Sequence, residues 1–292
     1  MFISILTPSY NRVHTLKKLY DSLENQSNKG FEWIIVDDGS TDDTRSYIME
    51  VINKASFTVR YIYINNGGKH SAINEGVKVI GNALTFIVDS DDYLTRDAVD
   101  VIFKIWQEYK SNSSIASFWF LQSDPNGNLV GEKFPIDNSI STYTDIMINS
   151  GIKGDKKSVY VTEVRKKFPF PIFLEEKFIG ESTVHKRIGD KYNSVFVNKV
   201  IYISEYLSDG LTSAGTNMRI KNPLGGMTNS KEFLSNNVIF KIRIKKLILF
   251  IMYGFFAKKD YKKIILNSGS PILAIICTPV SYLLFKKWGK LK

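Results

Sequence analysis

The feature that most constrains the fold is a regular alternation of short apolar runs and amphipathic segments over the first 125 residues. Apolar runs at 2–6, 33–36, 59–64, 84–88 and 117–121 have the length of strands, and segments of helical periodicity separate them. This alternation of strand and helix patterns predicts an α/β fold with a mostly parallel central sheet and flanking helices. In such sheets ligands bind beyond the carboxyl ends of the strands.

Polar runs follow three of these strands, at residues 7–12, 37–40 and 89–92, and we expect them to converge on one crevice. In the last run, Asp89 and Asp91 alternate, so both side chains can lie on one face. Two neighbouring carboxylates repel each other, and a hard cation such as Mg²⁺ or Mn²⁺ removes that conflict. The plainer interpretation is a solvated loop that begins a helix.

The other two runs are compatible with a nucleotide. A buried carboxylate at Asp37 or Asp38 could accept the ring N–H of a pyrimidine, although a simple turn bent at Gly39 would look the same. The run 7–12 could hold a base or a ribose. Asn11 in that run is also a predicted cap of a helix that extends to about Gln26.

Taken in order, these motifs resemble the family 2 glycosyltransferases with the GT-A fold. The resemblance is carried by the sequences Thr-Pro-Ser-Tyr-Asn-Arg at 7–12, Val-Asp-Asp-Gly-Ser-Thr-Asp at 36–42, Asp-Ser-Asp-Asp at 89–92 and the segment 67–76 between the third and fourth strands. It covers residues 1–125 closely and extends loosely to about 230. Bacterial enzymes that build capsule or other surface polysaccharides are the members that the sequence resembles most.

The resemblance implies roles for particular residues. Donor binding would involve residues at the strand ends and in the segment 67–76: Thr7, Pro8, Asn11, Asp38 (or Asp37), Lys69, Asn74 and Asp89. Asp89 and Asp91 would form an Asp-X-Asp motif, with Asp91 nearest a divalent Mn²⁺ or Mg²⁺ ion. The implied reaction is an inverting transfer from a nucleotide-sugar, most simply a UDP-sugar, to a saccharide or lipid-linked saccharide acceptor.

The catalytic base implied by the resemblance is a carboxylate in the acceptor half. Relatives carry Glu-Asp at a helix start, whereas this sequence has Gly180-Glu181-Ser182, so Glu181 is the predicted base and Glu175 and Glu176 are the alternatives. Glu181 could instead only interact with the helix dipole. Arg219 could clamp the donor diphosphate, and the turn-rich segment 209–215 before it is a candidate lid.

The C-terminal segment differs from the rest in charge. Twelve of the 39 Lys and Arg residues but only one of the 29 acids lie after residue 235, so this tail carries +11 and the remainder −1. The apolar runs 247–257 and 270–285, the second broken by Pro271 and Pro279, fall short of the roughly 20 residues of a spanning helix. Bases beside short apolar runs predict an interfacial helical tail on an anionic membrane. The alternative is a hairpin packed on the catalytic body.

We therefore predict a GT-A catalytic domain over 1–235, with a nucleotide-sugar half at 1–125 and an acceptor half at 126–235, and a membrane-associating tail at 236–292. With one cysteine and no signal-peptide pattern at its N-terminus, the chain is expected in the cytoplasm, on the inner face of the membrane. Nucleic acid is not an expected partner. The alternatives are a nucleotidyltransferase, which normally carries a Gly-rich loop where this chain has Pro8, and an inactive membrane scaffold.

Overall fold

The chain forms two compact units, which we describe separately from a computed structural model that describes residues 1–205 and 211–290. Unit 1 comprises Met1–Pro169 and Ile188–Tyr206, and unit 2 comprises Phe170–Arg187 and Leu207–Lys292. Residues 209 and 210 of the candidate lid lie outside the described residues. The boundaries of these two units differ from the predicted boundary at residue 235. The predicted boundary separates a catalytic part from a membrane-associating part, and that division of function stays a prediction.

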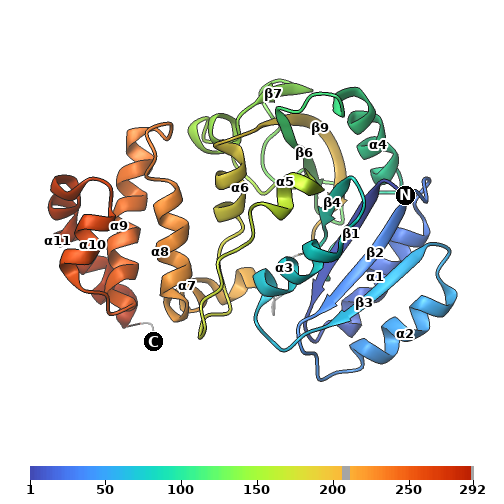
Figure 1. Ribbon diagram of the computed structural model, residues 1–292, viewed down its shortest axis with the longest axis horizontal. Helices are drawn as coiled ribbons and strands as arrows, with labels where there is room; N and C mark the ends of the chain where they lie inside the picture. Colours follow the sequence, from blue (N-terminus) through green and yellow to red (C-terminus); the bar gives the residue numbers. More distant parts are fainter. Residues whose placement is uncertain (206–210, 291–292) are drawn as a thin grey trace. The chain divides into compact units, whose positions relative to one another are not determined.

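One mixed sheet builds unit 1 (Figure 1). Its strands lie in the order β3-β2-β1-β4-β8-β6-β9-β5, and β7 pairs with β9. The pairs β3–β2, β2–β1, β1–β4 and β6–β9 are parallel, whereas β8 runs antiparallel to both β4 and β6. The strands are β1 (Ile3–Ser9), β2 (Phe31–Asp37), β3 (Thr58–Tyr63), β4 (Leu84–Ile87), β5 (Tyr93–Leu94), β6 (Ile115–Ser123), β7 (Ser139–Ser141), β8 (Lys157–Val161) and β9 (Asn193–Ile203).

Helices follow the first strands and flank the sheet, as the alternation predicted (Figure 1). Every residue of β1, β2 and β6 is buried, which explains why these strands read as continuous apolar runs. The main core lies between sheet and helices and includes Trp33, Phe86 and Tyr202. The helical elements are α1 (Val13–Glu24), α2 (Thr44–Lys54), α3 (Lys69–Val79), α4 (Ala98–Tyr109), α5 (Thr162–Lys166) and a short π-helix, η1 (Thr144–Asn149).

A glycine allows α3 to lie close against the sheet. A Cβ atom on Gly76 would approach Leu6 Cδ1 to 2.3 Å and Val36 Cγ2 to 3.0 Å, so only glycine fits at this point of contact with β1 and β2. The close packing fixes the first residue of α3, Lys69, near the carboxyl ends of the strands.

Unit 2 is helical, and the described part of the tail is helical as predicted (Figure 1). Residues of α9 such as Leu247 and Ile251 form a core with Ile264 of α10 and Ala274 of α11, and Met227 of α8 packs against it. The helices are α6 (Ser182–Gly189, whose last two residues belong to unit 1), α7 (Leu211–Lys221), α8 (Pro223–Glu232), α9 (Phe240–Phe256), α10 (Tyr261–Asn267) and α11 (Pro271–Gly289).

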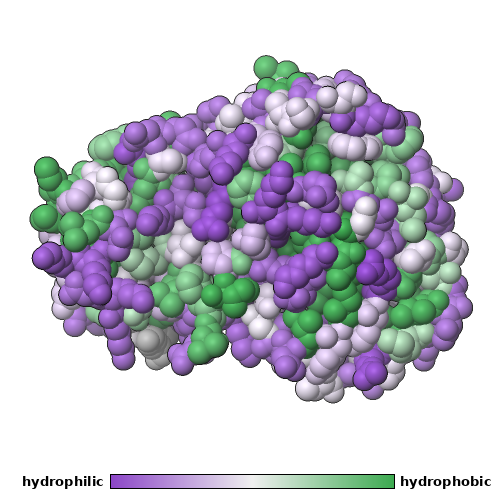
Figure 2. Space-filling view, viewed as in Figure 1, coloured by the Kyte–Doolittle hydropathy of each residue, from purple (hydrophilic) through white to green (hydrophobic). Residues whose placement is uncertain are grey.

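The expected interruption of the last apolar run is wrong. Pro271 occupies the first turn of α11, where proline is well tolerated, and Pro279 lies inside a helix that continues through all 19 residues. By length and composition this one helix among the described residues could cross a membrane, and 17% of its apolar window is buried. Figure 2 shows hydrophobic residues gathered over α11 beside a hydrophilic patch.

Candidate active site at the carboxyl ends of the strands

Three polar runs lie at one edge of the sheet in unit 1. The strands β2, β1 and β4 are parallel neighbours, and their register pairs Ser9 with Asp37 at the carboxyl ends of β1 and β2. The run 89–92 follows β4 and turns into β5. The convergence expected from the alternation of strands and helices is therefore present.

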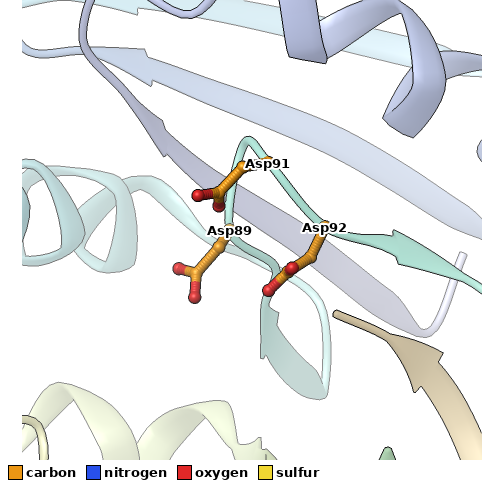
Figure 3. Close-up of side chains that lie close together, drawn as sticks. All are labelled: Asp89, Asp91 and Asp92. Carbon is orange, nitrogen blue, oxygen red and sulfur yellow. The ribbon is translucent and has the colours of Figure 1, made fainter. Parts of the chain in front are cut away.

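The turn after β4 carries three carboxylates close together. Asp89, Asp91 and Asp92 each offer one oxygen, and these oxygens lie within 4.8 Å of one another (Figure 3). Oxygen-only donor sets of this kind suit hard divalent cations such as Mg²⁺ and Mn²⁺. The structure thus adds Asp92 to the pair that the sequence had indicated.

Two lysines neutralise Asp89. The Nζ atom of Lys69, at the start of α3, lies 2.6 Å from Asp89 Oδ1, and that of Lys157, at the start of β8, lies 3.4 Å from Oδ2. Burial would raise the pKa of Asp89, but these two ammonium groups outweigh it and hold the pKa well below its usual range. Asp89 is therefore a carboxylate at neutral pH whose charge is already balanced.

Tyr202 of β9 connects the turn after β4 to a strand that is not a neighbour of β4 in the sheet. Its hydroxyl donates to Asp92 Oδ2 at 2.7 Å and accepts from the backbone N–H of Asp89 at 3.1 Å. The other Asp92 oxygen accepts from the backbone N–H of Glu205 at 3.0 Å, and Lys157 Nζ lies 4.1 Å from the centre of the Tyr202 ring. Burial, with repulsion from Asp89, raises the pKa of Asp92 to about 6 despite Lys157 nearby.

Asp91 has a different environment. Burial and then repulsion from Asp89 raise the pKa of its carboxyl. Within residues 1–205 and 211–290, no basic group lies at ion-pair distance from it. A carboxylate in this position gains most from an added cation. That Asp91 lies nearest the metal stays a prediction.

The strand end and the helix cap predicted at the first polar run are wrong, whereas its role in donor binding stays a prediction. Thr7 and Pro8 lie within β1, where both are buried, and the Thr7 hydroxyl accepts a hydrogen bond from Trp33 Nε1 at 2.9 Å. Asn11 does not cap α1, which begins at Val13 after Arg12. With a φ of 52°, Asn11 instead accepts from the backbone N–H of Thr41 at 2.8 Å, and so joins the loops after β1 and β2.

Asp37, the last residue of β2, and Asp38, which follows it, hold neighbouring loops. Asp37 accepts from the backbone N–H of Ser40 at 2.8 Å and from the Tyr61 hydroxyl at 2.6 Å. Asp38 accepts from the backbone N–H groups of Gly67 and Gly68 at 2.7 and 2.8 Å, in the turn that leads into α3. Both carboxylates therefore order the loops around the carboxylate cluster. Asn74, also predicted near the donor, is buried in α3.

The remaining predicted residues belong to unit 2. Glu181 precedes α6, and its carbonyl accepts the first helical hydrogen bonds, from Val184 and His185. Glu176, an alternative base, accepts from the backbone N–H groups of Leu224 and Gly225, both at 2.7 Å, at the start of α8. Glu176 thus has a structural role at a helix N-terminus, which leaves Glu181 as the stronger choice of the two.

Arg219 lies near the end of α7 in unit 2, on the surface. Its predicted contact with the donor diphosphate stays a prediction.

Lys157 and Tyr202 were missed from sequence because nothing local marks them. Lys157 reaches the turn because β8 runs antiparallel to β4, so its first residue lies beside the carboxyl end of β4. Tyr202 lies near the end of a strand that pairs with β6 and β5. Asp92 could have been found, since it stands in the same acidic run as Asp89 and Asp91.

A mixed sheet with acidic residues at the carboxyl ends of its parallel strands places this unit among the α/β proteins that bind ligands at that edge. The family model for glycosyl transferase family 2 matches residues 4–158, which is more than half of the chain and most of unit 1. The chain therefore belongs to glycosyl transferase family 2, a family of glycosyltransferases.

Several known proteins are similar to this chain in sequence or in fold. Glycosyltransferase GlyA of Streptococcus pneumoniae is 33% identical over 118 residues, which are 40% of this chain and 17% of GlyA. The chain spans about a fifth of the length of several curated relatives that it matches.

The crystal structure of Staphylococcus aureus TarS residues 1–349 with UDP-GlcNAc has a TM-score of 0.63 at 20% identity, over 94% of this chain and 81% of that one. The mannosyltransferase PcManGT from Pyrobaculum calidifontis, in complex with GDP-Man and Mn²⁺, has a TM-score of 0.58 at 15% identity, over 99% of this chain and 82% of that one. At these identities the likeness concerns the fold.

Proposed function

We propose that this protein transfers a sugar from a nucleotide-sugar, most simply a UDP-sugar, to a saccharide or lipid-linked saccharide in the synthesis of a surface polysaccharide. The observation that carries the proposal is the cluster of Asp89, Asp91 and Asp92 at the carboxyl end of β4, in a chain of glycosyl transferase family 2. The UDP-GlcNAc and GDP-Man bound by the structural relatives support a nucleotide-sugar donor.

A divalent metal, Mn²⁺ or Mg²⁺, would be held by Asp91 and by the neighbouring carboxylates of the cluster. The fit rests on the donor set: the oxygens are hard ligands, and among the described residues no basic group lies at ion-pair distance from Asp91. When bound, the cation would neutralise a donor diphosphate and stabilise the departing nucleoside diphosphate. Lys69 and Lys157 would keep Asp89 ionised and aimed into the same space.

Different residues of the chain would bind the donor and activate the acceptor. The ordered loops around Asn11 and Asp38 would hold the nucleoside. Glu181, at the start of α6, would take the proton from the acceptor hydroxyl as it attacks the anomeric carbon, which inverts the configuration. Arg219 would complete the donor site.

We also propose that the tail binds the inner face of an anionic membrane. The exposed apolar residues of α11, such as Ile272 at 78% and Leu283 at 70%, support the proposal, as does the tail's charge of +11. Because α8 packs against α9, removal of the whole tail would disturb unit 2. Substitutions on the exposed face of α11 are therefore the appropriate test, and Ile276→Asp with Leu283→Asp should reduce sedimentation with anionic vesicles.

The donor proposal is tested by incubating the purified full-length protein with Mn²⁺ and a panel of nucleotide-sugars. Release of nucleoside diphosphate supports glycosyl transfer or donor hydrolysis, whereas release of pyrophosphate from a sugar phosphate and a nucleoside triphosphate would support a nucleotidyltransferase. Asp91→Asn should abolish turnover and leave the fold intact. The matched control is Asp155→Asn, which removes one exposed carboxylate from unit 1. Near wild-type turnover of Asp91→Asn would contradict the metal assignment.

A further inference from the structure

Two buried polar side chains at the carboxyl edge of the sheet are not explained by the proposed reaction. Gln122 is the next-to-last residue of β6, and Ser204 directly follows β9, which runs parallel to β6. Because β8 is antiparallel to both β4 and β6, the carboxyl ends of β4 and β6 lie at the same edge. We propose that Gln122 and Ser204 bind the sugar ring of the donor and favour an uncharged sugar over a uronic acid. This inference rests on the proposed glycosyl transfer and names the class of sugar transferred.

Both side chains carry a buried oxygen that lacks a partner. Gln122 is 1% exposed and Ser204 is 7% exposed, and among the described residues neither Gln122 Oε1 nor Ser204 Oγ has a hydrogen-bond partner. Their backbones, in contrast, are paired: Val130 N–H donates to the Gln122 carbonyl at 3.0 Å, and Ser204 N–H donates to the Ser123 carbonyl at 2.9 Å. A buried acceptor without a partner destabilises the folded protein. A ligand that donates hydrogen bonds at this place would remove that cost.

Gln122 lies on the face of the sheet from which the carboxylate cluster is held. Side chains alternate along a strand, so Gln122 shares a face of β6 with Phe120. Phe120 pairs with Lys157 of β8, and Gln122 itself pairs with Tyr202 of β9, whose ring belongs to the same core as Phe120. Lys157 Nζ lies 3.6 Å from Asp92 Oδ2, and the Tyr202 hydroxyl donates to the same oxygen at 2.7 Å. Gln122 is therefore a neighbour of two side chains that contact Asp92.

Ser204 lies in a segment that contacts the same carboxylate. Tyr202, two residues before Ser204, donates to Asp92 Oδ2, and the backbone N–H of Glu205, the next residue, donates to Asp92 Oδ1 at 3.0 Å. Hydrogen bonds on both sides of Ser204 thus fix it beside the carboxylate cluster. Gln122 and Ser204 approach the cluster from two neighbouring strands.

The order of the strands indicates which part of the donor these residues would meet. Across the sheet the order is β2, β1, β4, β8, β6 and β9. The proposed nucleoside loops follow β1 and β2, and the carboxylate cluster, where the diphosphate would lie, follows β4. The sugar is attached to the second phosphate, so a donor that continues along this edge would place its sugar at β8 and β6. Neighbouring strands lie about 4.8 Å apart, which puts β6 about 10 Å beyond β4. A change of rotamer would turn the long Gln122 side chain toward that ring.

The chemistry of the two side chains favours an uncharged sugar. A carboxamide oxygen and a serine hydroxyl can each accept a hydrogen bond from a sugar hydroxyl or from the N–H of an acetamido group. Neither group carries a charge that would balance a uronate carboxylate, and Asp89 and Asp92 would repel one. The ammonium group of Lys157 already pairs with both aspartates. A neutral hexose or N-acetylhexosamine therefore fits this place better than a uronic acid.

Calorimetry on the purified full-length protein with Mn²⁺ separates the sugar from the nucleotide. The ligands are UDP, UDP-glucose, UDP-GlcNAc and UDP-glucuronate, and a second series of GDP, GDP-mannose and GDP-mannuronate. The variants are Gln122→Met, which keeps the length of the side chain but removes the carboxamide, and Ser204→Ala. Gln107→Met is the matched control, because Gln107 is exposed on α4 of the same unit.

We expect Gln122→Met and Ser204→Ala each to weaken binding of the neutral nucleotide-sugar about 3- to 10-fold, the scale of one hydrogen bond between uncharged groups. Affinity for the nucleoside diphosphate alone should not change, and Gln107→Met should affect neither ligand. The wild-type protein should bind the neutral nucleotide-sugar about 10-fold or more tightly than the uronate of the same series, because like charges repel at close range.

Thermal unfolding without ligand distinguishes sugar binding from a structural role. Each substitution removes a buried oxygen that has no partner, so Gln122→Met and Ser204→Ala should be at least as stable as the wild-type protein. A side chain with a structural hydrogen bond would instead lower the unfolding temperature when substituted.

Four results would overturn the inference. Unchanged affinity for neutral nucleotide-sugars in both variants would mean that neither side chain meets the sugar, and equal weakening of nucleoside diphosphate and nucleotide-sugar would assign them to the nucleotide. Lower unfolding temperatures of both variants would show a structural role. Equal affinity of the wild-type protein for the neutral sugar and the uronate would refute the preference. In these cases binding of the nucleoside diphosphate leaves the proposed reaction intact, whereas a wild-type protein that binds no ligand of either series would refute the proposed donor and this inference together.

Discussion

The ammonium group of Lys157 is predicted to stabilise unit 1 by balancing the charge of the carboxylate cluster. It lies 3.4 Å from Asp89 and 3.6 Å from Asp92, and its side chain is only 20% exposed. Loss of one partner of a buried ion pair costs about 3–5 kcal/mol. Because Lys69 remains on Asp89 and the site is partly solvated, we expect Lys157→Met to lower the free energy of unfolding by about 1–3 kcal/mol.

The assay is urea unfolding of the full-length protein, followed by tryptophan fluorescence. Trp33, Trp106 and Trp119 all belong to unit 1, so the signal reports mainly on the affected unit. Lys199→Met is the matched control. Lys199 pairs with Asp97 at 2.8 Å, but both side chains are about half exposed, and such pairs contribute about 0–1 kcal/mol.

Two further features of the same experiment distinguish charge from packing. The depressed pKa of Asp89 contributes stability that is present above its unfolded pKa, near 4, and lost as pH falls through the folded value. The difference between Lys157→Met and wild type should therefore be largest near pH 7 and shrink below about pH 4. Added Mn²⁺ should stabilise the variant more than the wild type, since the lysine no longer competes for Asp89.

The reasoning would be refuted if Lys157→Met and wild type unfolded at the same urea concentration at pH 7. It would also be refuted if the destabilisation persisted unchanged at acid pH, or if Mn²⁺ stabilised both proteins equally. In either of these cases the apolar packing of the Lys157 side chain, and not its charge, would be the important part.

Three other outcomes are expected. Glu181→Gln should preserve UDP binding in calorimetry and reduce turnover about 10²-fold, the scale of general-base loss. Loss of nucleotide binding with unchanged turnover of the bound donor would instead assign Glu181 to the donor site. The pKa of Asp92 is raised to about 6, so this carboxyl loses its proton as pH rises through 6. Mn²⁺ affinity, measured by direct titration, should therefore increase from about pH 5 to pH 7, and an affinity that does not change with pH would exclude Asp92 from the metal site. Gly76→Ala should lower stability by about 1–3 kcal/mol through its contact with Leu6, whereas Gly81→Ala, which has open space, should be near neutral in the same thermal unfolding experiment.

The sequence of the first 125 residues contains most of what was needed to predict their fold. Strands such as β1 and β2 are buried on both faces, so they appear as apolar runs, and the polar residues after them mark the strand ends. The exact roles were harder to predict. Thr7 looked accessible after a strand end, but β1 extends to Ser9 and Thr7 bonds to Trp33 inside the sheet.

The second half was less predictable because long-range pairing decides it. Lys157 and Tyr202 enter the carboxylate cluster only through the pairing of β8 with β4 and of β9 with β6, and no local pattern records those pairings. The role of Glu176 depends in the same way on where α8 begins. Pro279 suggested a break, yet α11 continues through it, because an interior proline can kink a helix without ending it.

The reversal of strand direction at β8 has a consequence for how relatives of this protein could diverge. After β6 the chain forms the excursion 124–156, in which β7 pairs with β9 and η1 follows, and it returns at β8 between β4 and β6. The return point is fixed by pairing on both sides, so Lys157 keeps its place whatever the length of the excursion. Surface connections tolerate insertions far better than paired strands do. This segment could therefore change in length and sequence during evolution while the charge balance of the carboxylate cluster stays constant.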